Sequence, residues 1–491
     1  MRLAHVVSEA VPFSKTGGLA DVAGALPKAQ AALGLDVSVV LPAHRPTVQT
    51  PPPGTPVGTV EALGLQGKVY ELLQDGVRFL FLDCPPLFVR PALYSLPEGD
   101  FPDNPMRFAW FSRAALQVTQ DRQVIHVHDW QAALVPFLLA CQADSSRPQP
   151  ATVITIHNLA YQGVFPPWVL SACHLPEAYF TMEFLEYYGQ VNFLKAGLTT
   201  ASAITTVSPT YAREILTPAF GCGLEGVLAK RQDRLFGILN GLDEELWDPA
   251  RDAALPLPYT RENLTAGKEA AAQELRRALG MSPSSRPILG MVSRITEQKG
   301  ADVLVAALED ILQLGFDVVV LGTGEGRFEE LLKAAQAAHP DRVAVALRFD
   351  DRLARLIYAG SSLFLMPSRW EPCGLGQMIA MRYGTLPVVH ATGGLADTVR
   401  DASQPDGNGF VFSPLTPQEL VRALQRAKEL LAQPEAWQEL QRRAVSQDFS
   451  WKSSAQKYLE LYRWLLGLEP TGARRQQGLL AAFFPRPGPS R

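Results

Sequence analysis

Long apolar runs, paired cysteines and an excess of charge are all missing from this 491-residue sequence. No stretch reaches the roughly 18 consecutive apolar residues of a membrane-spanning helix. The 45 basic and 49 acidic residues leave a formal net charge of only -4, so we expect neither a membrane nor a nucleic acid as partner. The five cysteines include no C-x-x-C pair, which argues against a disulfide framework and a zinc site. The start, MRLAHVVSEAVPF, lacks the pattern of a signal peptide, and we expect a cytoplasmic protein.

A dinucleotide fingerprint is also missing. The segment LGTGEGRFEELL has two of the three glycines of G-x-G-x-x-G, but Arg327 stands where the third is required. A nicotinamide-dependent oxidoreductase is therefore disfavoured. The pairs His128-Asp129 and His157-Asn158 come without a helical i, i+4 histidine pair or a D-x-D sequence, so we expect no metal dependence.

What the sequence does have is a regular series of short, unbroken apolar runs with amphipathic segments between them. Such runs are typical of strands covered on both faces by helices, and their alternation with helices indicates parallel sheets. The fold class predicted is α/β, with two Rossmann-like doubly wound domains facing each other across a cleft. The expected strands are 2–8, 35–42, 77–84, 123–130, 151–158, 202–208 and 234–241, then 287–294, 316–322, 342–349, 362–369, 386–391 and 409–413.

The strand series pauses after Gly241 in a segment rich in proline and charge. We therefore predict an N-terminal domain over 1–245 and a C-terminal domain over 246–450. The amphipathic segment 451–468 is expected to form a helix that packs back on the first domain. Residues 469–491, rich in proline, glycine and arginine, are expected to be disordered.

The hexapeptide TGGLAD occurs twice, at Thr16–Asp21 and at Thr392–Asp397. Each copy follows an expected strand. Paired glycines allow a sharp turn and a close approach to a ligand, and a helix that starts there offers free N–H groups to an anion. Lys15 adds a positive charge to the first copy only. We expect both turns to line one binding site, the alternative being a packing turn beside a solvated lysine.

Two further loops carry candidate chemistry in the second half. Arg294 and Lys299 follow an expected strand and lie five residues apart, a pattern that suits a diphosphate. Glu371 follows another strand and precedes Gly374 and Gly376, which predicts a carboxylate beside backbone N–H donors, able to bind sugar hydroxyls or stabilise an oxocarbenium-like state. The alternatives are solvated surface charges and a helix cap, for which glutamate is a poor choice.

Histidines end two expected strands of the first half. His157 and His128 stand at carboxyl ends, where ligands bind in open α/β sheets. His126 lies in mid-strand and is expected to be a packing residue.

Several motifs together resemble one family. KTGGLADV, DNPMRFAWF, VHDW, TIHNLAYQG, GILNGLD, SRITEQKG and PSRWEPCGLGQM occur in order between residue 1 and about residue 465. They are similar to the bacterial glycogen synthase and starch synthase family of retaining glycosyltransferases. This resemblance implies the GT-B fold, ADP-glucose as donor, an α-1,4-glucan as acceptor, and no metal or other cofactor. It also implies a front-face reaction in which the leaving phosphate deprotonates the incoming 4-hydroxyl.

The resemblance also implies roles for matching residues. Those expected to be catalytic are Glu371, His157, Lys299, Arg294 and Lys15. Those expected to bind the donor are Lys15, Gly17, Gly18, Asp21, Asn240, Arg294, Lys299, Phe349, Cys373, Gly374, Leu375, Thr392, Gly393 and Gly394. Asp129, Asn158 and Tyr94 are expected at the acceptor or along the cleft.

The sequence departs from the family pattern at Phe349, where a tyrosine is expected to stack on adenine, and at Ser362, often an aspartate. A GT-B enzyme with a UDP-sugar donor and an inactive glucan-binding protein remain alternatives, although the set Lys15, Arg294, Lys299 and Glu371 disfavours the second.

Overall fold

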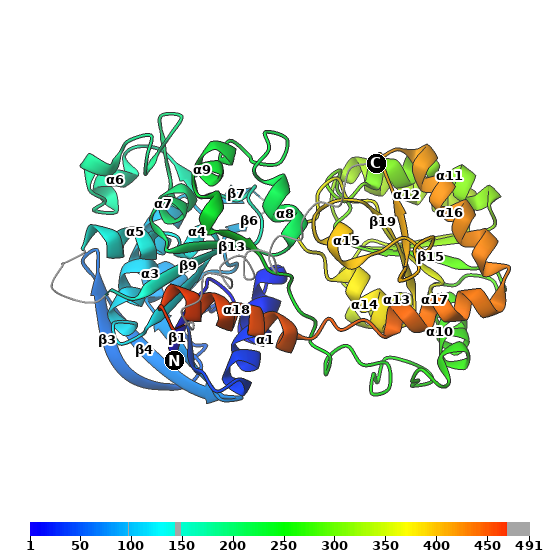
Figure 1. Ribbon diagram of the computed structural model, residues 1–491, viewed down its shortest axis with the longest axis horizontal. Coiled ribbons are helices and arrows are strands. Elements are labelled where there is room, and N and C mark those ends of the chain that lie inside the picture. Colours follow the sequence, from blue (N-terminus) through cyan, green and yellow to red (C-terminus); the bar gives the residue numbers. More distant parts are fainter. Residues whose placement is uncertain (97, 143–148, 469–491) are drawn as a thin grey trace. The chain divides into compact units, whose positions relative to one another are not determined.

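A computed structural model describes residues 1–96, 98–142 and 149–468. The chain divides into two compact units (Figure 1), Met1–Gly241 with the C-terminal helix, and Leu242–Ser450. The boundary lies four residues before the predicted one. The predicted tail 469–491 falls outside the described residues. Within the described part, no helix is both long and apolar enough to cross a membrane.

The first unit is built on a sheet of order β14-β13-β9-β8-β1-β2-β5-β4-β3. Strands β14 to β5 in that order are parallel, and the chain order reverses between β1 and β8. Their bounds are β1 (Arg2–Val6), β2 (Asp36–Pro42), β5 (Val77–Asp83), β8 (Val124–His128), β9 (Ala151–Ile156), β13 (Ala203–Thr206) and β14 (Leu235–Gly237). All seven strands predicted for this half are confirmed.

The antiparallel hairpin of β3 (Thr55–Ala62) and β4 (Leu65–Gln74) at one sheet edge was not predicted. Leu63 and Gly64 connect the strands, both with positive φ, which is the backbone of a two-residue hairpin turn. Most of β3 is exposed, so it lacks the apolar run by which the other strands were recognised. Two small sheets, β6 (Ser95–Leu96) with β7 (Gly99–Asp100), and β10 (Val164–Phe165), β12 (Gln190–Asn192) and β11 (Glu186–Tyr187), also escaped prediction.

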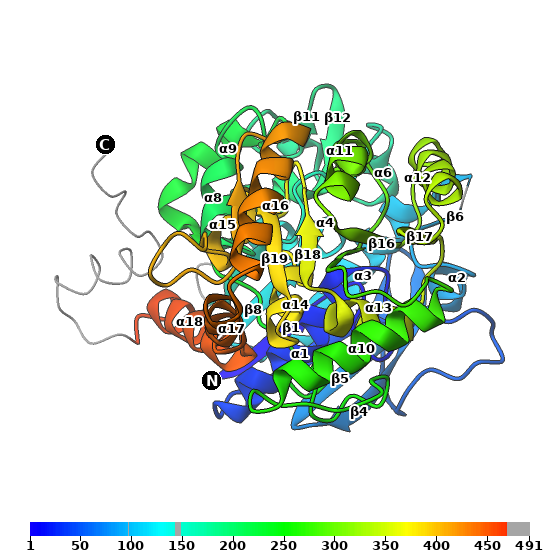
Figure 2. The same cartoon turned by 90° about the vertical axis from the view of Figure 1, so that its right-hand side faces the viewer.

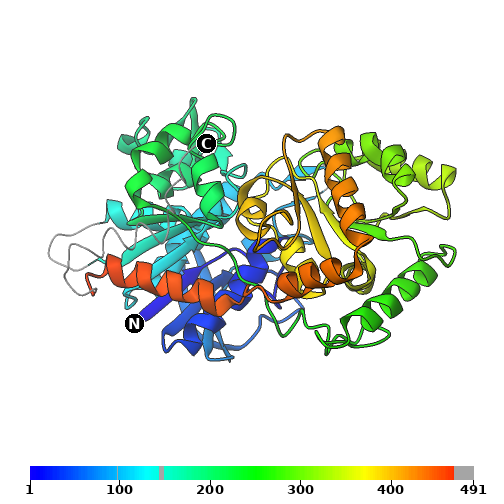
Figure 3. The ribbon, with the colours of Figure 1, turned by 45° about the vertical axis from the view of Figure 1, so that its right-hand side comes forward.

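Helices cover both faces of the first sheet. Those of this unit are α1 (Gly18–Ala32), α2 (Pro85–Phe88), α3 (Asn104–Val118), α4 (Asp129–Ala132), α5 (Leu134–Cys141), α6 (Val169–Ala172), α7 (Phe193–Thr200), α8 (Pro209–Glu214), α9 (Glu225–Lys230) and α18 (Trp451–Leu465). Helix α18 lies beside α1 (Figures 1 and 3). Its Trp451, Tyr458 and Tyr462 join Leu3 and Val37 of the sheet in one apolar core, so the last helix among the described residues belongs to the first unit.

The second unit has an all-parallel sheet of order β17-β16-β15-β18-β19-β20, the strand order of a Rossmann fold. The strands are β15 (Ile288–Val292), β16 (Asp317–Leu321), β17 (Val343–Ala346), β18 (Leu363–Met366), β19 (Leu386–His390) and β20 (Phe410–Phe412). All six predicted strands are confirmed. Figure 2 shows β18 and β19 with helices around them.

Alternate side chains of these strands point into two cores, as covered strands require. Val318 and Val320 of β16 join a core with α11 and α16, whereas Val319 and Leu321 join one with α10 and α13. The helices are α10 (Leu264–Ala278), α11 (Ala301–Gln313), α12 (Gly326–Ala338), α13 (Asp351–Gly360), α14 (Gly376–Arg382), α15 (Gly393–Thr398), α16 (Pro417–Leu431) and α17 (Pro434–Val445).

Candidate active site

A largely buried ion pair lies in the loops that follow two neighbouring strands of the second unit. The Nζ of Lys299 donates to Oε2 of Glu371 at 2.5 Å, and the Ser368 hydroxyl donates to the same oxygen at 3.0 Å. The side chains of Lys299 and Glu371 are only 17% and 8% exposed. Glu371 is thus not a helix cap, and Lys299 is not a solvated surface charge.

The strand order explains why these two residues meet. Lys299 follows β15 and Glu371 follows β18, and these neighbouring strands flank the point where the chain order reverses, at which ligands of open α/β sheets bind. Gly300 brings the loops together, because a Cβ there would lie 1.9 Å from the carbonyl oxygen of Pro367. Only glycine allows this approach, with its φ of +74°.

The second TGGLAD copy packs against the loop that carries Glu371. The N–H of Gly394 donates to the carbonyl oxygen of Glu371 at 3.0 Å. A Cβ on Gly393 would lie 2.0 Å from that oxygen, and one on Gly394 would lie 2.1 Å from the carbonyl oxygen of Cys373. These glycines therefore allow close packing against the Glu371 loop.

The first TGGLAD copy differs. A Cβ on Gly17 or Gly18 would meet nothing within 4 Å, and both glycines are exposed. The Nζ of Lys15 donates to Asp21 at 2.7 Å in an exposed pair. The first turn thus has open space and a lysine beside the N-terminus of α1. This arrangement leaves room for an anion.

Glu9, which the sequence analysis missed, fixes this turn. Its Oε2 accepts from the backbone N–H of Thr16 at 2.6 Å and from the Thr16 hydroxyl at 2.8 Å. The side chain is buried, and burial raises the pKa of the Glu9 carboxyl despite these donors. The signal was available, since Glu9 follows the first strand directly.

The remaining predicted donor residues of the second unit lie in loops at the same sheet edge. Arg294 is exposed and donates to Gln298 at 3.1 Å. Phe349, after β17, is 90% exposed, so its ring makes little packing contribution. Cys373 is buried, while Gly374 and Leu375 are partly exposed just before α14. Gln377 donates to the carbonyl oxygens of Cys373 and Gly374, which holds this loop in place.

The strand ends of the first unit gather a second group of polar residues. Oδ1 of Asp129 accepts from the backbone N–H of His157 at 2.7 Å, and burial raises the pKa of the Asp129 carboxyl to about 7. Asn158 accepts from Ala160 within its own turn. The Tyr94 hydroxyl bonds to Ser8 at 2.7 Å. Asn240, after β14, has a buried Oδ1 with no hydrogen-bond partner among the described residues.

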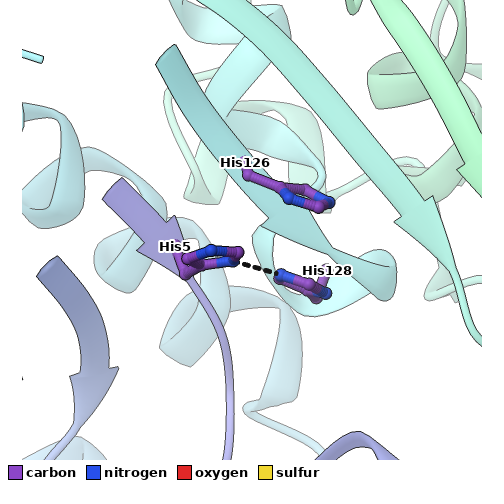
Figure 4. Close-up of side chains that lie close together, drawn as sticks. All are labelled: His5, His126 and His128. Carbon is purple, nitrogen blue, oxygen red and sulfur yellow. Dashed lines mark hydrogen bonds between the residues drawn. The ribbon is translucent and has the colours of Figure 1, made fainter. Parts of the chain in front are cut away.

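Three histidines cluster behind this group. His5, His126 and His128 are fully buried with ring nitrogens close together (Figure 4). Both nitrogens of each ring already have polar partners, and the His126 and His128 rings are stacked at 22°. The cluster is therefore a hydrogen-bonded chain, and His126, expected only to pack, is one of its members.

Structure thus groups the predicted residues in two sets, one at the strand ends of each Rossmann-like unit. These sets contain glycine turns, cations and a buried carboxylate beside backbone N–H groups. Such groups can together bind a sugar linked to a diphosphate. With two such units, the fold and site define a glycosyltransferase of the GT-B class.

Comparison with known proteins identifies the family. Residues 2–230 match the model of the starch synthase catalytic domain, and residues 273–444 match that of glycosyl transferases group 1. The glycogen synthase of Syntrophotalea carbinolica is 46% identical over 94% of this chain and 98% of its own. Glycogen synthase 2 of Geobacter sulfurreducens is 45% identical with the same coverage.

A solved structure agrees. The catalytic domain of starch synthase IV from Arabidopsis thaliana, bound to ADP and acarbose, superposes with a TM-score of 0.85 at 33% identity, covering 95% of this chain and 99% of that one. The chain therefore belongs to the glycogen synthase and starch synthase family and is a glucosyltransferase. An oxidoreductase is excluded.

Proposed function

We propose that this protein transfers glucose from ADP-glucose to the non-reducing 4-hydroxyl of a growing α-1,4-glucan, with retention of configuration. The observation that carries this proposal is the ion pair of Lys299 with the buried Glu371 at the Rossmann switch point. Support comes from the relatives named glycogen synthase and from the related starch synthase that holds ADP and acarbose.

The second unit is assigned the donor. Lys299 and the exposed Arg294 neutralise the diphosphate and help ADP leave, Lys299 as a point charge and Arg294 as a bidentate donor. Glu371 binds glucose hydroxyls and stabilises the positive charge that develops on the anomeric carbon. Cys373, Gly374 and Leu375 supply backbone N–H groups around the sugar. Thr392, Gly393 and Gly394 act mainly by holding the Glu371 loop, as their packing indicates.

Glu371 is proposed as an electrostatic stabiliser and not as a nucleophile. One of its oxygens already accepts from an ammonium and a hydroxyl, and a carboxylate so occupied is a weak nucleophile. Retention then follows a front-face route, in which the leaving phosphate takes the proton of the incoming 4-hydroxyl. This route needs no protein base and no cofactor.

The first unit is assigned the remaining contacts. Lys15 with the open turn of Gly17 and Gly18 approaches the diphosphate and glucose, and Asp21 orients Lys15 through their 2.7 Å contact. His157 faces the sugar. Asn240 offers its unpartnered oxygen to the donor.

The acceptor is assigned to Asp129, Asn158 and Tyr94. Asp129 fixes the His157 backbone, so its role is partly one of positioning. None of the five cysteines, all of which the structure describes, forms a disulfide, and we place the enzyme in the cytoplasm, where thiols stay reduced.

Phe349 is assigned to the adenine. A ring that is 90% exposed is free to stack on a base, and a phenylalanine does so without the hydroxyl of a tyrosine. Stacking alone does not choose between adenine and uracil, so the donor base is the point to test.

The test is turnover with glycogen as primer and either ADP-glucose or UDP-glucose as donor. Release of ADP with elongation of the glucan supports the proposal. Preference for UDP-glucose would replace the donor, and glucan binding without turnover of either would favour an inactive binding protein.

A further inference from the structure

A continuous chain of side-chain hydrogen bonds leads from His157 into the core of the first unit. His157 Nε2 lies 3.0 Å from His128 Nδ1, and His128 Nε2 lies 3.0 Å from His5 Nδ1. His5 Nε2 lies 2.7 Å from the side-chain oxygen of Gln30 in α1. Figure 4 shows the His5 and His128 rings meeting edge to edge. His5, His128 and Gln30 are fully buried, with no exposed surface.

All of these imidazoles are neutral. Burial lowers the pKa of His5 to about 4 and that of His157 to about 3, and it holds the pKa of His128 well below its usual range. A neutral imidazole carries one N–H, so one ring nitrogen donates and the other accepts. Each hydrogen bond in the chain therefore dictates the next.

The direction of the chain follows from Gln30. Its oxygen can only accept, so His5 carries its proton on Nε2 and accepts at Nδ1. His128 must then donate from Nε2 and accept at Nδ1. His157 must in turn donate from Nε2. The nitrogen left without a proton is Nδ1 of His157, for which no hydrogen bond is found among the described residues.

The other end of the chain holds the Gln30 amide in this orientation. Its NH2 group donates to the Tyr462 hydroxyl of α18 at 3.2 Å, and this hydroxyl lies 2.7 Å from Nδ1 of His126. Nε2 of His126 bonds to Thr155 at 2.5 Å. With Tyr462 accepting from Gln30 and donating to His126, every member has a partner and the protons all point the same way.

We propose that Gln30 is a positioning residue that acts through His5 and His128 to hold His157 as the Nε2–H tautomer, presenting an unprotonated Nδ1 that accepts a hydrogen bond from a sugar hydroxyl. The tautomer assignment rests on the hydrogen-bond geometry, on neutral imidazoles and on a Gln30 amide whose oxygen faces His5, while the contact with sugar rests on the proposed function. The unprotonated Nδ1 makes His157 selective for a substrate with a hydroxyl donor facing this nitrogen.

The direct test is NMR of the full-length protein labelled with 15N-histidine, without substrate. The His157 signals are identified by their loss in His157→Asn. The expected spectrum shows a protonated Nε2 and an unprotonated Nδ1. A proton on Nδ1 would overturn the proposal, because it would mean that the whole chain runs in the opposite direction.

Variants test the role of Gln30. Gln30→Met removes the acceptor, and His157 is expected to become a mixture of tautomers, whereas Gln30→Glu keeps an oxygen facing His5 and restores the Nε2–H form. Gln162→Met removes another buried glutamine of the same unit that lies outside the chain, and it is expected to leave the tautomer unchanged. A pure Nε2–H form in folded Gln30→Met would show that Gln30 does not position His157.

Kinetics connect the tautomer to the reaction. Gln30→Met is expected to lower kcat/KM for ADP-glucose by about 2- to 10-fold, the loss expected for one hydrogen bond. The loss should vanish for the one deoxy-glucose analogue that lacks the hydroxyl facing His157. An equal loss with every analogue would overturn the sugar contact. If NMR agrees but no variant, nor the wild type, turns over ADP-glucose, the proposed function fails and the tautomer assignment remains.

Discussion

The backbone N–H of Gly394 donates to the carbonyl oxygen of Glu371 at 3.0 Å. The second TGGLAD turn thus fixes the backbone of Glu371, whose carboxylate is paired with Lys299. The first TGGLAD turn has no such packing contact at Gly17 or Gly18. Substitutions in the two turns should therefore have different effects.

The two glycine turns should respond differently to alanine. Gly394→Ala places a Cβ 2.1 Å from the Cys373 carbonyl oxygen and is expected to lower the free energy of unfolding by about 1–3 kcal/mol through overpacking. Gly18→Ala meets open space and should leave stability unchanged or slightly higher, while impairing turnover if substrate approaches there. Chemical denaturation and initial rates measure the two effects. Equal loss of stability in both variants would contradict the structural difference.

Removal of the Glu371 carboxylate should impair turnover much more than it impairs folding. Glu371→Ala is expected to reduce kcat by about 10^2- to 10^3-fold, the range for losing one group that stabilises developing charge. Circular dichroism must show a folded protein. Exposed Glu330→Ala serves as control, since that residue only pairs with Lys333. Near-normal kcat in Glu371→Ala would refute the assigned role.

Lys299→Ala should weaken donor binding and slow ADP departure, raising KM and lowering kcat together. It also leaves the buried Glu371 without its ammonium, which is costly for a buried pair. Lys333→Ala, in an exposed pair, controls for the loss of a lysine. Steady-state kinetics with ADP-glucose measure both effects. Unchanged KM and kcat would show that Lys299 has only a structural role.

Phe349→Ala should raise the KM for ADP-glucose by about 5- to 160-fold, the equivalent of the ~1–3 kcal/mol found for stacking of a base on an aromatic ring. Stability should not change, because the ring is 90% exposed. Phe349→Tyr should retain the affinity. An unaltered KM in the alanine variant would place adenine elsewhere.

Acid should destabilise the first unit well above the pH at which carboxylates protonate. Burial lowers the pKa of His5 to about 4 and that of both His44 and His157 to about 3, and it holds the pKa of His126 and that of His128 well below the usual range. Below about pH 6.5 the unfolded chain binds protons that these folded histidines do not, so each costs about 1.4 kcal/mol of stability per pH unit down to its folded pKa.

Two carboxyls oppose this trend. Burial raises the pKa of Asp129 to about 7 and also raises that of Glu9, so each makes the fold more stable as pH falls, but five histidines outweigh two carboxyls. Urea midpoints between pH 7 and 5 should therefore fall steeply. His44→Gln should lessen the slope, whereas the exposed His174→Gln should not. A flat profile would show that the histidines are not neutral by burial.

The fold was predictable wherever strands are covered on both faces. Such strands give unbroken apolar runs, and all thirteen predicted strands occur. The β3–β4 hairpin was missed because the exposed edge strand Thr55–Ala62 contains Pro56 and Gly58 and has no unbroken apolar run. Lys299 and Glu371 were predictable as strand-end residues.

What the sequence could not indicate is which side chains meet across long separations. Gln30 and His5 lie 25 residues apart, and Gln30 and Tyr462 lie 432 apart; no local pattern connects them. The purpose of a glycine is equally hidden. Identical TGGLAD letters describe an open turn at Gly18 and a packed one at Gly394, because the difference lies in the neighbour and not in the hexapeptide.

The position of α18 in the first unit constrains the order in which the nascent chain folds. Trp451 and Tyr462 complete a core that also contains Leu3, while about 210 residues between Gly241 and Trp451 form the second unit. At ~5–20 residues per second of synthesis, the ribosome needs roughly 10–40 s to make that insertion. During this interval the sequence of the second unit is completed before that of the first, and the α1 face of the first sheet is covered by α1 without α18 until Trp451–Leu465 has been made.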